Sequence, residues 1–141
     1  MQFRSLLLPL LAQVLLTFTV WVWLFARRVP EIRRRRIDPQ RLQDRDAVNA
    51  LLPDSARVSN NLKNLFEMPV LFYAAILLSL FLMIQDTLTV QLAWAYVALR
   101  WAHSLIHCSY NNVNQRFVAY ALSCLVLALI WLRLATFIIS Y

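Results

Sequence analysis

The chain has 141 residues, of which 61% are hydrophobic and 15% are charged, and its formal net charge is +7. Soluble domains are about 45–50% apolar, so the composition favours a membrane protein, and the length suits one domain. The absence of glycine excludes Walker and dinucleotide-binding loops and the nucleophile elbow, because these motifs need glycine where the backbone approaches a ligand or takes a positive φ.

The first predicted element is a membrane helix over residues 5–26, since about 20 apolar residues span a bilayer. Arg4 followed by an apolar run is also a feature of signal peptides. The run is longer than the apolar region of such a peptide, however, and it ends at Arg27 and Arg28 with no small-x-small cleavage site. We therefore expect a helix of the mature protein.

A basic segment over residues 27–56 follows and contains most of the arginines. We expect irregular structure there, with one short helical piece near residues 40–51. By the positive-inside rule this segment and the loop over residues 108–116 lie in the cytoplasm, with both termini outside. Membrane topology explains most of the basic charge, so nucleic acid is not an expected partner. Attraction of Arg33–Arg36 to anionic lipid head groups is compatible with this topology.

Three further spans are predicted over residues 62–84, 88–107 and 117–139. The second helix should begin near Ser55 and continue to Ile84, and the third should run from Thr87 to about Asn112. A short turn joins them, so they are antiparallel neighbours. The predicted fold is an all-α, integral-membrane four-helix antiparallel bundle in one domain over residues 1–141.

Polar side chains gather on one face of the second helix and one face of the third at the helical period of about 100° per residue. Buried polar groups in a membrane need partners, so we expect the two faces to enclose a pocket near the cytoplasmic side. Arginine can bind carboxylates, and Glu67 can accept from an ammonium group. Such a set is complementary to a zwitterionic, peptide-like ligand. Its members are Arg57, Asn60, Asn61, Asn64 and Glu67 on the second helix, and Arg100, His103, His107 and Tyr110 on the third.

Other roles for these side chains remain open from the sequence. Glu67 could pair with Arg100 or Arg57 instead of a ligand. His103 and His107, four residues apart, could line a pocket, hydrogen-bond between helices, or hold a metal or haem. We predict no metal site, because no carboxylate or cysteine supports the two histidines. Cys108 lies off the polar face and is not expected to be a nucleophile.

The segment Asn64-x-x-Glu67-x-Pro69, with Arg100-x-x-His103 and Arg116, resembles the MAPEG superfamily of membrane-associated proteins in eicosanoid and glutathione metabolism. The segments RVSNNLKNLFE and RWAHSLIHCSYN resemble the bacterial members of this superfamily more than the animal enzymes. Asn60 stands where the animal enzymes carry an arginine, with Arg57 about one turn earlier. His107 stands where relatives have a tyrosine, with Tyr110 nearby.

The resemblance implies a homotrimer of four-helix subunits, here in a bacterial inner membrane, with glutathione as co-substrate bound between neighbouring subunits. Asn64 and Glu67 would hold its polar ends, His103 and His107 would line the site, and Arg116 would stabilise the thiolate. Arg27 or Arg28 is the nearest counterpart of a further arginine at the end of the first helix.

The function we expect is that of a glutathione-dependent membrane transferase or peroxidase acting on a lipophilic electrophile. The alternative is a non-catalytic small-molecule-binding or scaffold protein of the same fold. A histidine-ligated metal or haem redox subunit is a third class. A Soret band in the visible absorption spectrum would support this third class.

Overall fold

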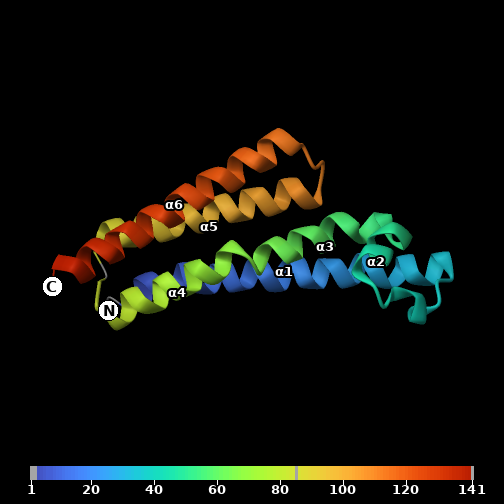
Figure 1. Cartoon of the computed structure of the whole chain (residues 1–141), viewed down its shortest axis with the longest axis horizontal. Helices are drawn as coiled ribbons and strands as arrows, with labels where there is room; N and C mark the ends of the chain where they lie inside the picture. Colours follow the sequence, from blue (N-terminus) through green and yellow to red (C-terminus); the bar gives the residue numbers. More distant parts are fainter. Residues whose placement is uncertain (1–2, 85, 141) are drawn as a thin grey trace.

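The computed structural model describes residues 3–84 and 86–140, and all regular secondary structure in these ranges is helical (Figure 1). The all-α prediction is therefore confirmed for the described part of the chain. The elements are α1 (Phe3–Arg35), the 3-10 helix η1 (Pro39–Leu42), α2 (Arg45–Leu51), α3 (Pro53–Leu65), α4 (Met68–Phe81), α5 (Thr87–Cys108) and α6 (Val113–Ser140).

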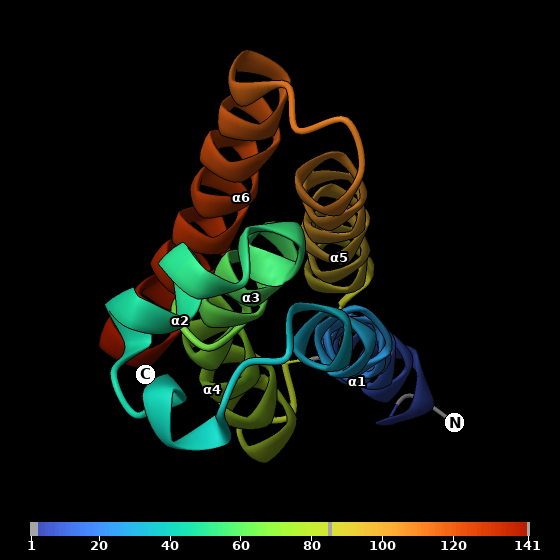
Figure 2. The same ribbon diagram turned by 90° about the vertical axis from the view of Figure 1, so that its right-hand side faces the viewer.

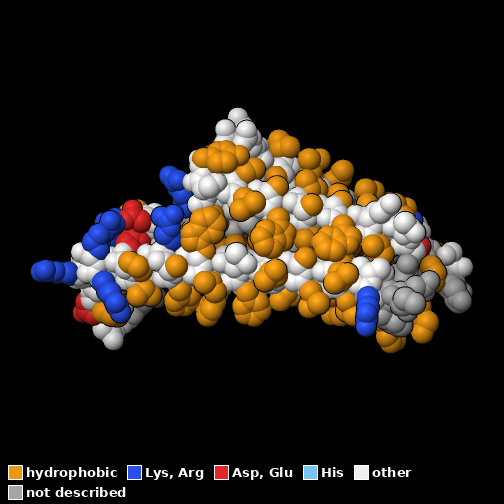
Figure 3. Space-filling view, turned by 180° about the vertical axis from the view of Figure 1, so that it is seen from behind, with side chains coloured by type: hydrophobic (Ala, Val, Ile, Leu, Met, Phe, Trp, Pro, Cys, Tyr) orange, Lys and Arg blue, Asp and Glu red, His pale blue; other side chains and the backbone are white. Residues whose placement is uncertain are grey.

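The helices run back and forth along one long axis, and both ends of the chain lie at the same end of the molecule (Figure 1). At the opposite end lie the C-terminal part of α1, η1, α2 and the start of α3, which we call the basic end (Figure 2). Helix α1 packs against α3, α4 and α5, while α6 packs along α5 and also contacts α4. Hydrophobic side chains cover the long middle of one face, and Lys and Arg side chains gather at the basic end (Figure 3).

Three helical stretches are long and apolar enough to cross a membrane: Arg4–Arg35, Pro53–Phe81 and Val113–Ser140. They correspond to the first, second and fourth predicted spans. The third predicted span, 88–107, is helical as α5 but is not among the three. Its hydropathy is lowered by Arg100, His103, Ser104 and His107, all of which are buried against neighbouring helices.

Helix α1 continues to Arg35, so the expectation of irregular structure over residues 27–35 was wrong. Arginine is a good helix former, and a tertiary contact holds this extension. Glu31 is only 3% exposed and its carboxylate accepts the backbone N–H groups of Asp54 and Ser55 at the start of α3. The predicted helical piece near residues 40–51 corresponds to η1 and α2.

The predicted continuous helix from Ser55 to Ile84 is interrupted at Phe66 and Glu67, between α3 and α4. Pro69 lies in the first turn of α4. A proline inside a helix lacks the N–H donor and clashes with the carbonyl four residues earlier, so the chain leaves the helical path just before it. At the end of α3 the Asn64 carbonyl accepts the N–H of Glu67 at 3.4 Å, and the same carbonyl takes part in the polar site described next.

Candidate functional site

The polar faces of α3 and α5 do meet near the basic end, through a hydrogen-bonded seam. Asn61 is fully buried, and its Nδ2 donates to Cys108 Sγ at 3.3 Å. The hydroxyl of Ser104, also buried, donates to Asn61 Oδ1 at 3.3 Å. This seam holds α3 and α5 in a fixed rotation, because a polar side chain inside a membrane protein needs its partners.

Arg100 is fully buried in this region, with 0% of its surface exposed. Its Nη2 donates at 3.0 Å to the carbonyl oxygen of Asn64, which the end of α3 makes available. Its guanidinium carbon stands 5.6 Å from the centre of the Tyr120 ring, a cation–π distance. The Nε and Nη1 atoms of Arg100 are buried and have no hydrogen-bond partner among the described residues. Buried unsatisfied donors are rare and point to water or a ligand.

His103 connects α5 to the first turn of α6. Its Nδ1 lies 3.0 Å from the carbonyl oxygen of Arg116. A carbonyl only accepts, so Nδ1 carries a proton, and in the neutral ring Nε2 is an acceptor. That Nε2 is buried without a partner in the part of the chain that the structure describes. The ring of His107 stands edge-on to His103 with 5.6 Å between ring centres.

The short turn between α5 and α6 sets the position of Arg116. Asn111 in this turn has φ of 52°, a left-handed conformation that asparagine tolerates better than most residues. The Nη1 of Arg116 donates to Asn111 Oδ1 at 2.8 Å, which orients the guanidinium. The same turn places the backbone carbonyl of Arg116 against the ring of His103, which lies 13 positions earlier in the chain.

A cavity of about 210 Å³ lies between the end of α3, α5 and the start of α6. Three of the sequence-predicted site residues, Asn64, His103 and Arg116, line it together. Tyr120 also lines it and was missed by the sequence reasoning. The sequence could have indicated Tyr120, because a residue four positions after Arg116 lies on the same face of a helix. The full lining is Asn64, His103, Val113, Arg116, Phe117 and Tyr120.

The other predicted residues lie around this cavity or away from it. Arg57 is exposed, donates to the Ser109 carbonyl at 3.4 Å, and lines a separate cavity of about 370 Å³ with Arg27. Asn60 faces a third cavity, between α1 and α3. The exposed Tyr110 donates its hydroxyl to Gln115 at 2.7 Å. Glu67 is exposed at the start of α4. Arg57, Asn60 and Asn64, which were predicted to share one face of the second helix, therefore line three different cavities.

Residues 3–84 and 86–140 contain no group of three or more His, Cys, Asp and Glu side chains placed to hold a metal ion. A family model described as MAPEG family matches residues 6–136, nearly the whole chain. No curated protein and no solved structure matches the chain.

Proposed function

We propose that this chain, which belongs to the MAPEG family, is a glutathione-dependent transferase or peroxidase acting on a lipophilic electrophile. The family match and the three apolar helices make it an integral membrane protein of a family of glutathione and eicosanoid metabolism. The observation that carries the finer proposal is Arg100, whose buried Nε and Nη1 lack partners in the described residues beside a cavity lined by Asn64, His103, Arg116 and Tyr120.

The residues around this cavity fit glutathione chemically. The ligand has two carboxylates, and arginine donors form strong charge-assisted hydrogen bonds with such groups. It also carries an ammonium group, for which we propose the exposed carboxylate of Glu67 at the α3–α4 junction as the partner. The cavity of about 210 Å³ is smaller than the roughly 300–1,000 Å³ of most small-molecule sites. We therefore propose that a neighbouring subunit of a homotrimer completes it.

The bound glutathione thiol would lose its proton, and the thiolate would displace a leaving group from an electrophilic carbon. With a peroxide the thiolate would instead cleave the O–O bond and release the alcohol, and a second glutathione would reduce the resulting sulfenic acid to give glutathione disulfide and water. Arg116 cannot serve as a base, because its guanidinium stays protonated. Held by Asn111 at the cavity wall, it would act electrostatically, since a nearby cation lowers a thiol pKa from its usual value near 8.5. Tyr120 offers a hydroxyl donor at the same wall. Excluding water from the closed site would strengthen each of these interactions.

We also propose that α5 is the fourth membrane crossing and that the basic end faces the cytoplasm of a bacterial cell. The 22 residues of α5 extend about 33 Å, close to the roughly 30 Å hydrocarbon core. Its buried polar side chains Arg100, His103 and Ser104 face α3 and α6 instead of lipid. Reporter fusions at the two termini and within residues 36–44 would test this orientation.

The activity test uses detergent-purified protein, glutathione and a chromogenic electrophile. We expect conjugation by the wild-type protein, weaker glutathione binding in Glu67→Gln, and near-complete loss of turnover in Arg100→Gln. Replacement of the exposed Arg33, which lines none of these cavities, by glutamine is the matched control. Stabilisation by glutathione without conjugation would replace the enzyme with the non-catalytic binder. Absence of both effects would refute the glutathione proposal.

A further inference from the structure

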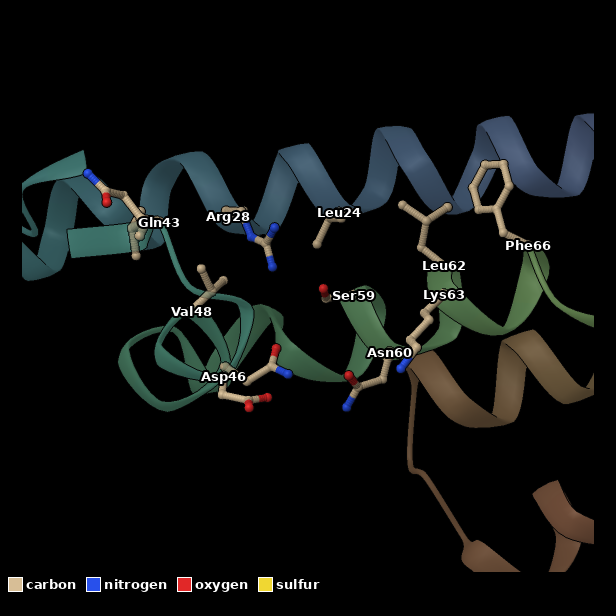
Figure 4. Close-up of a pocket in the computed structure, with 12 residues that line it drawn as sticks. Leu24, Arg28, Gln43, Asp46, Val48, Ser59, Asn60, Leu62, Lys63 and Phe66 are labelled. Atoms are coloured by element: carbon tan, nitrogen blue, oxygen red, sulfur yellow. The ribbon is translucent and has the colours of Figure 1, made fainter. Parts of the chain in front are cut away.

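The C-terminal parts of α1 and α5 and the start of α3 enclose a polar cavity at the basic end, which we call the α5-end cavity. Its volume is about 370 Å³, within the roughly 300–1,000 Å³ of most small-molecule sites. It shares no lining residue with the cavity at His103 and Arg116. Nor does it share one with the chamber of about 450 Å³ that Arg28 and Asn60 line between α1, α2 and α3 (Figure 4). Its wall consists of Arg27, Pro53, Asp54, Arg57, Val58, Cys108 and Ser109.

Two guanidinium groups in this wall have hydrogen-bond donors to spare. Arg27 makes no hydrogen bond or ion pair with any residue that the structure describes. Arg57 makes one hydrogen bond, from Nη1 to the Ser109 carbonyl, and at 3.4 Å this bond is long. Each guanidinium has five N–H donors. Because Arg27 belongs to α1 and Arg57 to α3, the spare donors border one space from two different helices.

The charged acceptor of the wall, in contrast, already has its partners. Asp54 is the acidic residue among those that line the cavity, and its carboxylate forms ion pairs with Arg34 and Arg35 on α1. The Ser109 carbonyl at the end of α5 accepts from Arg57. What the cavity leaves unused is therefore the donor capacity of two cations. The complement of such a set is an anion that accepts several charge-assisted hydrogen bonds.

The position of the cavity along α1 favours phosphate over other anions. The apolar run of α1 ends at Ala26, so Arg27 lies where the helix leaves the hydrocarbon. Lipid phosphates are concentrated in this layer, and soluble phosphates reach it from the water. A phosphate group has enough acceptor oxygens to bind two guanidinium groups at once.

We propose that the α5-end cavity binds a phosphate-bearing anion between Arg27 and Arg57, supplied either by a lipid head group or by a soluble phosphate. The site goes beyond the proposed glutathione chemistry and uses none of the residues that line the cavity at His103 and Arg116. Its tests contain no glutathione, so the two proposals can fail independently.

The test compares the wild-type protein with the double variant Arg27→Gln, Arg57→Gln in a non-ionic detergent at physiological salt. Calorimetry measures the affinity for inorganic phosphate and for glycerol phosphate. Native mass spectrometry measures the retention of phosphatidylglycerol and of phosphatidylcholine with identical acyl chains. The matched control is Arg33→Gln, Arg36→Gln, which removes the same charge from exposed arginines outside the cavity wall. A basic side chain near an anionic head group strengthens binding about fivefold, so the test variant should bind about 25-fold more weakly.

We expect one phosphate-bearing ligand per chain in the wild type and in the control. A loss confined to the soluble phosphates would identify a soluble ligand, and a loss confined to phosphatidylglycerol would identify a lipid head group; either supports the site. Equal weakening in the two double variants would overturn the proposal, because the basic end would then attract anions only by its overall charge. Undiminished binding by the test variant, or no binding of any probe by the wild type, would overturn it as well.

Two further variants separate the site from an effect on folding. Arg27 has no contact with a described residue to lose, so Arg27→Gln alone should bind about fivefold more weakly with an unchanged unfolding temperature in the absence of ligand. The double variant Arg27→Lys, Arg57→Lys should bind with an affinity between those of the wild type and the glutamine variant, because lysine keeps the charge but not the bidentate geometry. Binding by the lysine variant as weak as that of the glutamine variant would contradict the role of charge.

Discussion

Replacement of Glu31 by alanine tests whether a single carboxylate at the end of α1 fixes the start of α3. Both carboxylate oxygens accept backbone N–H groups at 3.0 Å, one from Asp54 and one from Ser55, and Arg35 Nε donates to the same group at 3.1 Å. The Glu31 side chain is 2% exposed. It thus acts as an N-terminal cap supplied by another helix, which satisfies donors that α3 itself leaves open.

The magnitude follows from the donors that the substitution leaves without a partner. Loss of a cap costs about 0.5–2 kcal/mol, and hydrogen bonds to a charged group contribute about 1.5–3 kcal/mol each. Two backbone hydrogen bonds are lost together with the one from Arg35, and the N–H of the fully buried Ser55 is left without its acceptor. We therefore expect Glu31→Ala to lower the free energy of unfolding by about 2–4 kcal/mol. The side chain of Asp54 is 47% exposed in its ion pairs with Arg34 and Arg35. Substitution of Asp54 by asparagine should therefore lower the free energy of unfolding by less than about 1 kcal/mol.

The assay is thermal unfolding in detergent followed by circular dichroism. At about 3 °C per kcal/mol for a chain of this size, Glu31→Ala should unfold about 6–12 °C below the wild type, and Asp54→Asn within about 3 °C of it. Glu31→Gln keeps one acceptor oxygen and should fall between them. The capping explanation is refuted if Asp54→Asn destabilises as much as Glu31→Ala, because the exposed ion pairs would then hold the junction.

Three further predictions concern the two ends of the molecule. Arg116→Ala should reduce turnover more than glutathione affinity, which steady-state kinetics and calorimetry separate; equal turnover would remove Arg116 from the mechanism. Tyr120→Phe should reduce turnover more than Tyr110→Phe, because only Tyr120 lines the cavity; equal rates in the two variants would contradict this. At the opposite end, burial acts to raise the pKa of Asp86, but hydrogen bonds from Thr89 and the charge of Arg133 outweigh it, so the pKa is lowered. Its stabilisation is then present above the ordinary carboxyl pKa and is lost as the pH falls through the lowered value. Asp86→Asn should cost under about 1 kcal/mol near neutral pH, with unfolding temperatures that converge in acid; a difference that persists in acid would contradict the ion pair.

Much of the fold could be predicted because it depends on composition and period. Long apolar runs require helices in a membrane, whatever surrounds them, since an unpaired backbone group in hydrocarbon is costly. The effect of Pro69 was also local. The chain leaves the helix just before Pro69, and Arg100 donates to the Asn64 carbonyl at the end of α3. The extension of α1 to Arg35 could not be predicted, because Glu31 is held by Asp54 and Ser55, which lie more than 20 positions away.

The candidate site shows the same division. The sequence by itself determined that Asn60, Asn61 and Asn64 project from one broad side of a helix, and that His103 and His107 project from one side of another. Only the tertiary structure decided that Asn60 lines the chamber near α1 and α2, that Asn61 bonds to α5 and that Asn64 reaches the cavity at α6. Helical period gives the direction of each side chain about its own axis, but the rotation of that axis against its neighbours is set by packing. Residues 100° apart on one helix therefore meet different neighbours when several other helices pack around it.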